Sequence, residues 1–399
     1  MLMRAMLAGA AMLALACAPA MAQTPLTQVK IGVLSDMSGP LADAYGPGSL
    51  HAAELAAADS QKLMPGVKIE VVGANHQNKV DVGSSIARQW YDQEKVDAIF
   101  DIVNTAVAIA VQGVAKERKK INWQMTGASS LTGQYCSPWA VHWSTDTHIQ
   151  TNGVAAGVVA AGGDTWFHIT ADYSGTREMA NQLKALIEKN GGKFLGEALF
   201  PMGSTDFASA VVQAQASGAK VIALSSGGLD TVNAIKQLAE FGLVKQGKKI
   251  VAPAMFVTDV KALGLEVAQG VTFVDSAYWD LSDDLRAFSK RFEEKIKKPP
   301  TPQQINVYTS VMHYLAAVKA AGTTDSDAVM AKVRSLPINY FNTKDGRVRE
   351  NGSVVKQRYV FEVKSPAESK GPWDLLKVAR ELTLEQGAPL PVDQSGCKL

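Results

Sequence analysis

Small hydroxyl- and amide-bearing residues recur in this sequence where strand-like segments end. They include Asn104 and Thr105, the run 126–130 and the run 225–228. At the start of a helix such residues offer free backbone N–H groups together with hydroxyls, a combination that can hold a carboxylate without a countercharge. The same residue types also serve as ordinary helix caps, and for any one loop both interpretations stay open. Their recurrence after strand upon strand favours a site for an anionic small molecule.

Patterns typical of enzymes are weak. Gly46, Pro47 and Gly48 resemble part of a dinucleotide-binding loop, but His51 occupies the third glycine position and the strand ends some ten residues earlier. Ser129 and Ser130 are not part of a Gly-x-Ser-x-Gly elbow. The six histidines form neither a His-Glu-x-x-His motif nor a close pair. The sequence therefore predicts a protein that is not an enzyme, with no catalytic residue, no metal site and no cofactor.

The elements that would position these residues alternate between strand and helix, which is typical of parallel sheets covered on both faces. We expect one doubly wound unit with strands at 29–34, 67–72, 96–102 and 121–125. We expect a second, following 141–143, with strands at 165–170, 193–200, 220–225, 250–253 and 271–274. A later helix is predicted over 302–321 with start signals at Thr301 and Pro302. Two extended segments with a turn at 350–352 should follow over 347–364.

Two similar units without a Pro- or Ser-rich linker suggest two lobes with a cleft between them. Removing 22 residues from 399 leaves 377, more than a single core usually organises. In open α/β sheets, ligands bind beyond the carboxyl ends of the strands. The fold class expected is thus α/β, with two Rossmann-like doubly wound lobes.

Residues 1–22 have the features of an export signal peptide. Arg4 precedes the apolar run 6–16, and Ala20 and Ala22 supply the small residues at which a signal peptidase cuts. The apolar run is shorter than the ~20 residues needed to span a bilayer. We expect cleavage after Ala22 and a periplasmic location; a lipid anchor on Cys17 is the alternative, with only a partial match to a lipoprotein box.

The charge balance restricts the class of partner. Without Arg4, 39 basic residues balance 38 acidic ones (40 − 1 against 38), so nucleic acid is not expected as a partner.

Cys136 and Cys397 would remain after cleavage, and two cysteines in an exported chain are predicted to pair. The tail 391–399 should then dock near Cys136.

Several segments, taken in order, resemble the periplasmic substrate-binding proteins of branched-chain-amino-acid-type ABC transporters. They are 29–40 (VKIGVLSDMSGP), the helix start at 46–48, 75–79 (NHQNK), 126–130 (TGASS) and 363–373 (VKSPAESKGPW). The resemblance implies type I lobes joined by a three-strand hinge, a small carboxylate ligand enclosed by closure, and a membrane permease as partner. It also implies 23–144 plus 279–350 as one lobe and 145–278 plus 351–390 as the other. We expect a monomer.

The resemblance also assigns roles within the predicted cleft. The carboxylate grip falls on Asn104, Thr105, Ala128, Ser129 and Ser130, and aromatic contacts fall on Tyr45 and Tyr173. From the other strand-end loops, Ser226, Gly227 and Phe256 complete the predicted ligand-binding set.

The same comparison raises a question about the ligand. Amino-acid binders of this family place an acid near the loop after the strand at 250–253, whereas here the first acid is Asp259. A buried charge without a partner costs several kcal/mol, so we expect an aromatic or otherwise apolar carboxylate, as in the family's importers of aromatic acids. A branched-chain amino acid is the alternative ligand. A sensor that reports ligand to a signalling partner is the alternative role.

Overall fold

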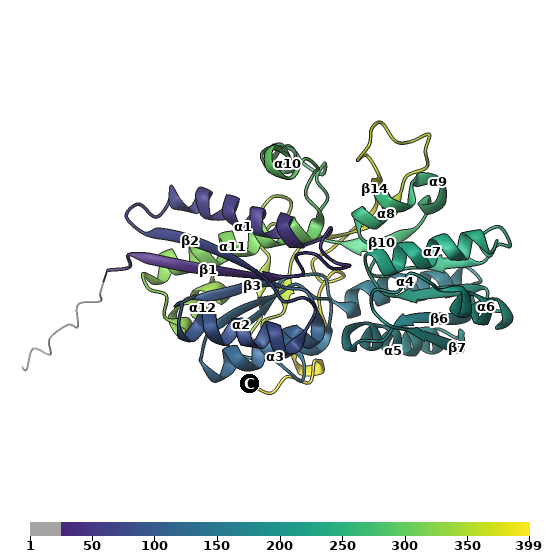
Figure 1. The fold of residues 1–399 in the computed structure, drawn as a ribbon, viewed down its shortest axis with the longest axis horizontal. Helices are drawn as coiled ribbons and strands as arrows, with labels where there is room; N and C mark the ends of the chain where they lie inside the picture. The colour runs from purple at the N-terminus through teal and green to yellow at the C-terminus, as the bar shows by residue number, and fades with distance from the viewer. Residues whose placement is uncertain (1–24) are drawn as a thin grey trace, which may run out of the picture.

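The computed structural model describes residues 25–399. The predicted signal peptide 1–22, its cleavage point and Cys17 lie outside the described residues. Within that described part of the chain, no helix is both long and apolar enough to cross a membrane. Two α/β lobes lie side by side (Figure 1).

The first lobe is built on a five-stranded parallel sheet in the order β2-β1-β3-β4-β5. Its strands are β1 (Gln28–Ser35), β2 (Lys68–Asn75), β3 (Ala98–Ile102), β4 (Ile121–Gln124) and β5 (Ala140–His142). Every residue of β3 is buried, as expected for a central parallel strand covered on both faces. The chain order reverses between β1 and β3, which places a switch point at their carboxyl ends.

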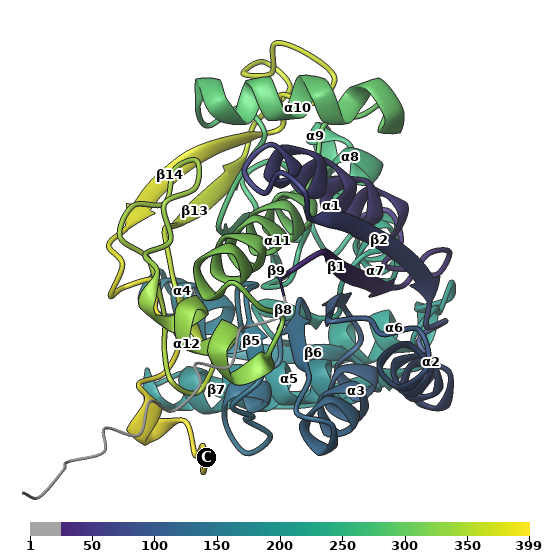
Figure 2. The same cartoon turned by 90° about the vertical axis from the view of Figure 1, so that its left-hand side faces the viewer.

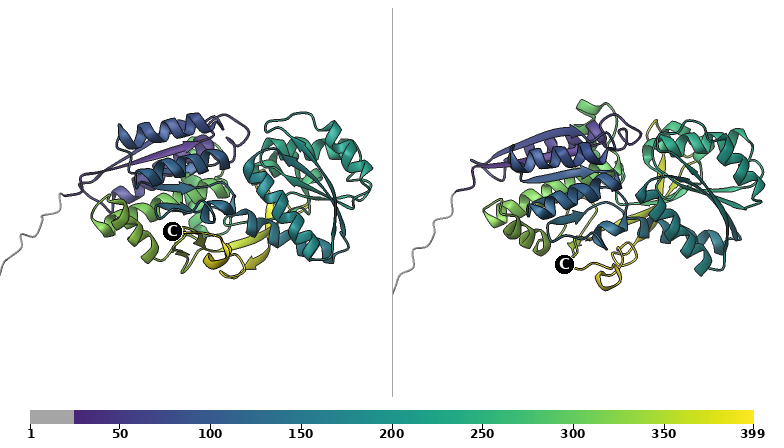
Figure 3. Two further views of the ribbon diagram at one scale, coloured as in Figure 1. Left: turned by 90° about the horizontal axis from the view of Figure 1, so that it is seen from below. Right: turned by 60° about the horizontal axis from the view of Figure 1, so that its bottom comes forward.

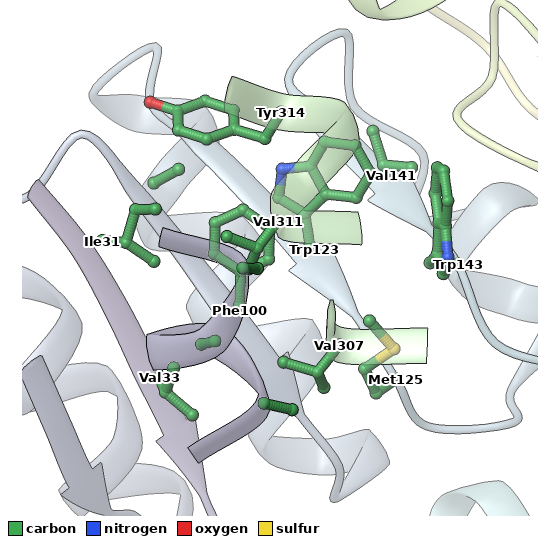
Figure 4. Close-up of a cluster of buried hydrophobic side chains, with 14 of the residues drawn as sticks. Ile31, Val33, Phe100, Trp123, Met125, Val141, Trp143, Val307, Val311 and Tyr314 are labelled. Carbon is green, nitrogen blue, oxygen red and sulfur yellow. The ribbon is translucent and has the colours of Figure 1, made fainter. Parts of the chain in front are cut away.

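Helices cover both faces of this sheet (Figure 2). They are α1 (Gly46–Gln61), α2 (Val80–Asp92), α3 (Thr105–Glu117), α11 (Pro302–Ala321) and α12 (Ser326–Ser335), and a further helix, α10 (Asp283–Ile296), packs against α1. The helix α11 begins where predicted, with a capping box between Thr301 and Gln304 and Pro302 in the first turn. In the core between α11 and the sheet, Trp123 stacks on Phe100 with ring centroids 5.4 Å apart (Figure 4).

The second lobe repeats the arrangement with a four-stranded parallel sheet in the order β7-β6-β8-β9. The strands are β6 (Thr165–Ala171), β7 (Lys193–Phe200), β8 (Val221–Ser225) and β9 (Lys249–Val251), and the helices are α4 (Thr147–Ala160), α5 (Ser174–Lys189), α6 (Ala208–Ala216), α7 (Leu229–Glu240), α8 (Val257–Leu263) and α9 (Leu265–Ala268). Its switch point lies between β6 and β8. The mixed α/β fold with parallel sheets is the class predicted from the sequence.

Three further strands run along the junction of the lobes (Figure 3). Strand β13 (Arg358–Val363) pairs with both β10 (Thr272–Asp275) and β14 (Leu376–Leu382) in an antiparallel sheet. The predicted turn at 350–352 joins the short hairpin of β11 (Arg347–Val348) and β12 (Val354–Val355). The chain passes between the lobes after β5, after β10 and after β12.

Arg358, fully buried, joins the segments of this junction. Its guanidinium donates to the backbone oxygens of Ser144, Val354, Lys356 and Gly387. These acceptors come from the first crossing, the third crossing and the segment after β14. One side chain therefore bonds segments that are far apart in the sequence.

The C-terminal tail folds back onto the first lobe. A short 3-10 helix, Val392–Gln394, leads to Cys397, which forms a disulfide with Cys136. Asn351 donates to Thr132 O at 2.8 Å and to Ser395 Oγ at 3.4 Å beside it. The pairing predicted from the cysteine count is thus present in the structure.

Candidate functional site

A cavity lies between the lobes, beyond the carboxyl ends of both parallel sheets. It encloses about 650 Å³ of empty space, part of it open to solvent. Its walls come from the segments after β1, β3, β4, β6, β8 and β9, and from the first and second crossings. The loops at the two switch points therefore face the same space, as the rule for doubly wound sheets predicts.

Seven of the ten residues predicted to bind ligand line this cavity: Tyr45, Thr105, Ala128, Tyr173, Ser226, Gly227 and Phe256. The other three, Asn104, Ser129 and Ser130, do not line it. Placement says which side chains can reach an enclosed molecule. It does not test the binding roles themselves, which stay predictions.

The loop after β4 and the start of α3 form the most polar wall. Thr105 Oγ1 and Thr126 Oγ1 share a hydrogen bond of 2.7 Å. Neither Gly127 N nor Ala128 N donates to a protein acceptor within residues 25–399. Asn104 caps α3, because its side-chain oxygen accepts from Ala106 N at 3.1 Å and Val107 N at 3.3 Å. The side-chain oxygen of Asn104 is therefore engaged in capping α3.

Ser129 and Ser130 turn towards a second, more polar cavity. Ser129 Oγ is 2.9 Å from Thr147 Oγ1, and Ser130 N donates to Glu178 Oε1 at 3.1 Å. Glu178 belongs to α5, so this bond joins the first lobe to the second. The carboxylate that meets Ser130 is thus one of the protein's own, and both serines line the second cavity beside Glu178.

Apolar side chains form another part of the cavity. Tyr45 and Phe256, from opposite lobes, meet edge to face with ring centroids 5.7 Å apart. Tyr45 Oη donates to Met125 O at 3.3 Å, which fixes its ring against the wall. Met125 and Met179 add flexible apolar surface. These four side chains give this part of the cavity an apolar surface.

Asp275, at the end of β10, is the only charged side chain among the described residues that line the cavity. It is 4% exposed. Its Oδ1 accepts from Ser276 N at 2.7 Å and its Oδ2 from Gln303 Nε2 at 2.9 Å. Burial raises the pKa of the Asp275 carboxyl to about 6, and these two hydrogen bonds act in the opposite direction.

Two buried cations near Asp275 belong to the third crossing. Lys356 Nζ donates to Asn306 Oδ1 at 2.6 Å and lies over the Trp143 ring. Burial lowers the pKa of Lys356 well below its ordinary value, and it lowers the pKa of Arg358 to about 10. Both cations favour the ionised form of Asp275, so its negative charge is not isolated.

The lobes touch around the cavity. A side chain added at Gly175, in the first turn of α5, would overlap Thr105 Oγ1 at the start of α3. One added at Gly228, whose φ is +64°, would overlap the backbone oxygen of Pro40. Two glycines of the second lobe thus allow close backbone approach to the first.

Sequence reasoning missed the part of the site that comes from the crossings and from α11: Ser144, Thr145, Asp275, Gln303 and Asn306. A signal for one of them was present, because Asp275 directly follows the predicted strand 271–274. Gln303 lies in the first turn of the helix predicted from 302. Within residues 25–399, no group of three or more His, Cys, Asp or Glu side chains could hold a metal ion.

Comparisons with known proteins agree with this architecture. A family model described as periplasmic binding protein matches residues 28–372. A crystal structure of a periplasmic binding protein from Burkholderia mallei is 42% identical, with a TM-score of 0.89 over 93% of this chain and 98% of that one. None of the curated proteins matches.

Two further solved structures are similar. A branched chain amino acid ABC transporter periplasmic ligand-binding protein from Burkholderia xenovorans is 35% identical, with a TM-score of 0.80 over 92% of this chain and 99% of that one. A solute binding protein of an ABC transporter from R. palustris, in complex with benzoate, is 18% identical, with a TM-score of 0.76 over 93% and 99%. At that identity the likeness concerns the fold alone.

Proposed function

Because the chain belongs to the periplasmic binding protein family, we propose that it is the extracytoplasmic solute-binding component of an ABC importer. It captures a small carboxylate, with an aromatic or otherwise apolar body, by closure of two lobes. The observation that carries the proposal is the interlobe cavity at both switch points, with neutral hydrogen-bond donors on one wall and aromatic rings on another.

The carboxylate would bind at the wall formed by α3 and the loop after β4. Gly127 N and Ala128 N are available as donors there, and the Thr105 hydroxyl lies on the same wall. Such fixed dipoles stabilise a negative charge without a cation. Asn104, Ser129 and Ser130 would act indirectly, by capping α3 and joining the lobes.

A branched-chain amino acid is the second candidate ligand. The Burkholderia xenovorans relative, at 35% identity, bears that transporter name, and Asp275 could pair with an ammonium group. The chain's partner would be the membrane permease of the importer; a signalling partner is the alternative.

The location, the oligomeric state and the lobe boundaries are part of the same proposal. The protein would be a periplasmic monomer after cleavage behind Ala22. Its lobes would comprise 23–144 plus 279–350 and 145–278 plus 351–390.

Titration calorimetry tests the proposal on protein freed of retained ligand by unfolding and refolding. We expect either a benzoate-type acid or leucine to bind with a micromolar or tighter Kd. Thr105→Val should weaken binding about tenfold by removing a hydroxyl from the grip. Ser130→Ala, on the second cavity, is the matched control. Failure of every small carboxylate to bind would contradict the proposal.

A further inference from the structure

We propose that the ligand carries a hydrogen-bond donor, a hydroxyl or an ammonium group, which binds Asp275 and Gln303 where β10 and α11 meet the cavity. This inference rests on the proposed function and narrows the class of carboxylate. A carboxylate with a purely hydrocarbon body would leave these groups without a partner.

The carboxylate of Asp275 has capacity beyond its protein contacts. An ionised carboxylate offers about four lone-pair positions, and the protein fills one on each oxygen, from Ser276 N and from Gln303 Nε2. The Ser276 hydroxyl lies farther from Asp275 Oδ1, at 3.5 Å, and donates to Asn306 Oδ1 at the shorter distance of 3.0 Å. Asp275 can therefore accept a further donor from the cavity that it lines.

Gln303 adds a second acceptor at the same place. Its Oε1 is buried and has no hydrogen-bond partner among the described residues. The amide orientation is set by chemistry, since the group that meets the Asp275 carboxylate must be the NH₂ donor. A buried acceptor left unpaired destabilises the protein, and a hydrogen-bond donor on the ligand would offset that cost.

The segments that carry Asp275 and Gln303 are joined through Asn306, which itself lines the cavity. Asn306 Oδ1 accepts from Ser276 Oγ and from Lys356 Nζ, which connects α11 to the second and third crossings. Because the acceptors sit on braced elements, they are preorganised for a donor. A neutral hydroxyl can satisfy them, since Lys356 and Arg358 already balance part of the charge, and an ammonium group would add a direct ion pair.

Matched ligand pairs test the inference on refolded, ligand-free protein. Calorimetry would compare benzoate with 3- and 4-hydroxybenzoate, and 4-methylpentanoate with leucine. We expect the donor-bearing member of at least one pair to bind about tenfold tighter or better. Equal or tighter binding by the donor-free members of both pairs would overturn the inference while leaving the proposed function intact. No binding by any member would instead contradict the proposed function, and the inference with it.

The substitution Asp275→Asn separates ligand recognition from a merely structural role. It keeps one oxygen acceptor and removes the charge, so it should reduce the preference within a pair, most strongly for an ammonium group. Asp230→Asn is the matched control: that carboxyl is also buried, its pKa is also raised to about 6 by burial, and it bonds Gly203 N outside the cavity. An unchanged pair preference in Asp275→Asn would overturn the inference, whatever the effect on stability.

Discussion

Gly175, which lines the cavity without contributing a side chain, offers a test of closure that removes no polar group from the cavity walls. It lies in the first turn of α5, and a Cβ there would overlap Thr105 Oγ1 and lie 3.2 Å from Thr105 Cβ. Thr105 cannot easily rotate away, because it is β-branched and its hydroxyl is bonded to Thr126 at 2.7 Å. Gly175→Ala should therefore oppose the closed arrangement of the lobes while the open form accepts the methyl group.

The size of the effect follows from overpacking. An inserted methyl group in a close contact costs about 1–3 kcal/mol, which corresponds to a Kd weakened about 5- to 150-fold. The ligand-free protein should lose no stability, since alanine exceeds glycine in helix propensity by up to about 1 kcal/mol. Affinity and stability are thus expected to change independently.

Calorimetry with the best carboxylate of the panel would measure the Kd, and X-ray scattering with ligand present would report closure. Gly113→Ala is the matched control, because Gly113 lies in α3 with nothing within 4 Å of its Cβ position. An unchanged Kd and a normally closed Gly175→Ala protein would refute the view that this contact belongs to the ligand-bound state.

Three further predictions concern charge, the tail and the lobe contact. Asp101 is fully buried at φ +62°, and burial raises its pKa to about 8. Between about pH 4, the pKa of this carboxyl in the unfolded chain, and about pH 8, the native state binds more protons than the unfolded state. The free energy of unfolding therefore falls as the pH rises, by up to about 1.4 kcal/mol per pH unit. Asparagine tolerates this backbone conformation, so Asp101→Asn should stabilise the protein relative to the wild type by more at pH 8 than at pH 5, as measured by denaturant unfolding. The same difference in unfolding free energy at both pH values would contradict this. Reducing the Cys136–Cys397 bond should cost about 2–5 kcal/mol of unfolding free energy without altering Kd, and equal unfolding midpoints with and without reductant would argue against a stabilising tail. Glu178→Ala should weaken ligand binding by about 1 kcal/mol, or several-fold in Kd, by removing the interlobe bond to Ser130 N; a Kd matching that of Ser130→Ala would show that this bond contributes nothing to closure.

Strand and helix positions were largely predictable because periodicity and end signals are local. The strand predicted over 193–200 is β7 with the same bounds, and Thr301 and Pro302 marked the start of α11. Strand β14, Leu376–Leu382, was missed. It is an edge strand whose residues Lys377 to Glu381 are largely exposed, so it lacks the alternation that a half-buried strand shows.

The site was predictable only where it depends on strand ends. Thr105, Ala128 and Tyr173 reach the cavity because parallel strands bring their loops to one edge. The direction of Ser130 depends on Glu178, which is distant in sequence and meets it only across the lobes. Asp275 directly follows the predicted strand 271–274, so the same rule applies to it, but the resemblance pointed to the loop after 250–253 as the place for an acid.

The bonding of Arg358 restricts how this molecule can move. Breaking the hydrogen bonds of a buried guanidinium would leave its charge without partners, which costs several kcal/mol. The carbonyl groups that accept these bonds belong to segments that run to both lobes. We expect the lobes to swing about this side chain as a fixed pivot, with changes in backbone torsion confined to the few residues flanking it. Substrate would then enter and leave through a rigid-body rotation, and neither sheet would need to loosen.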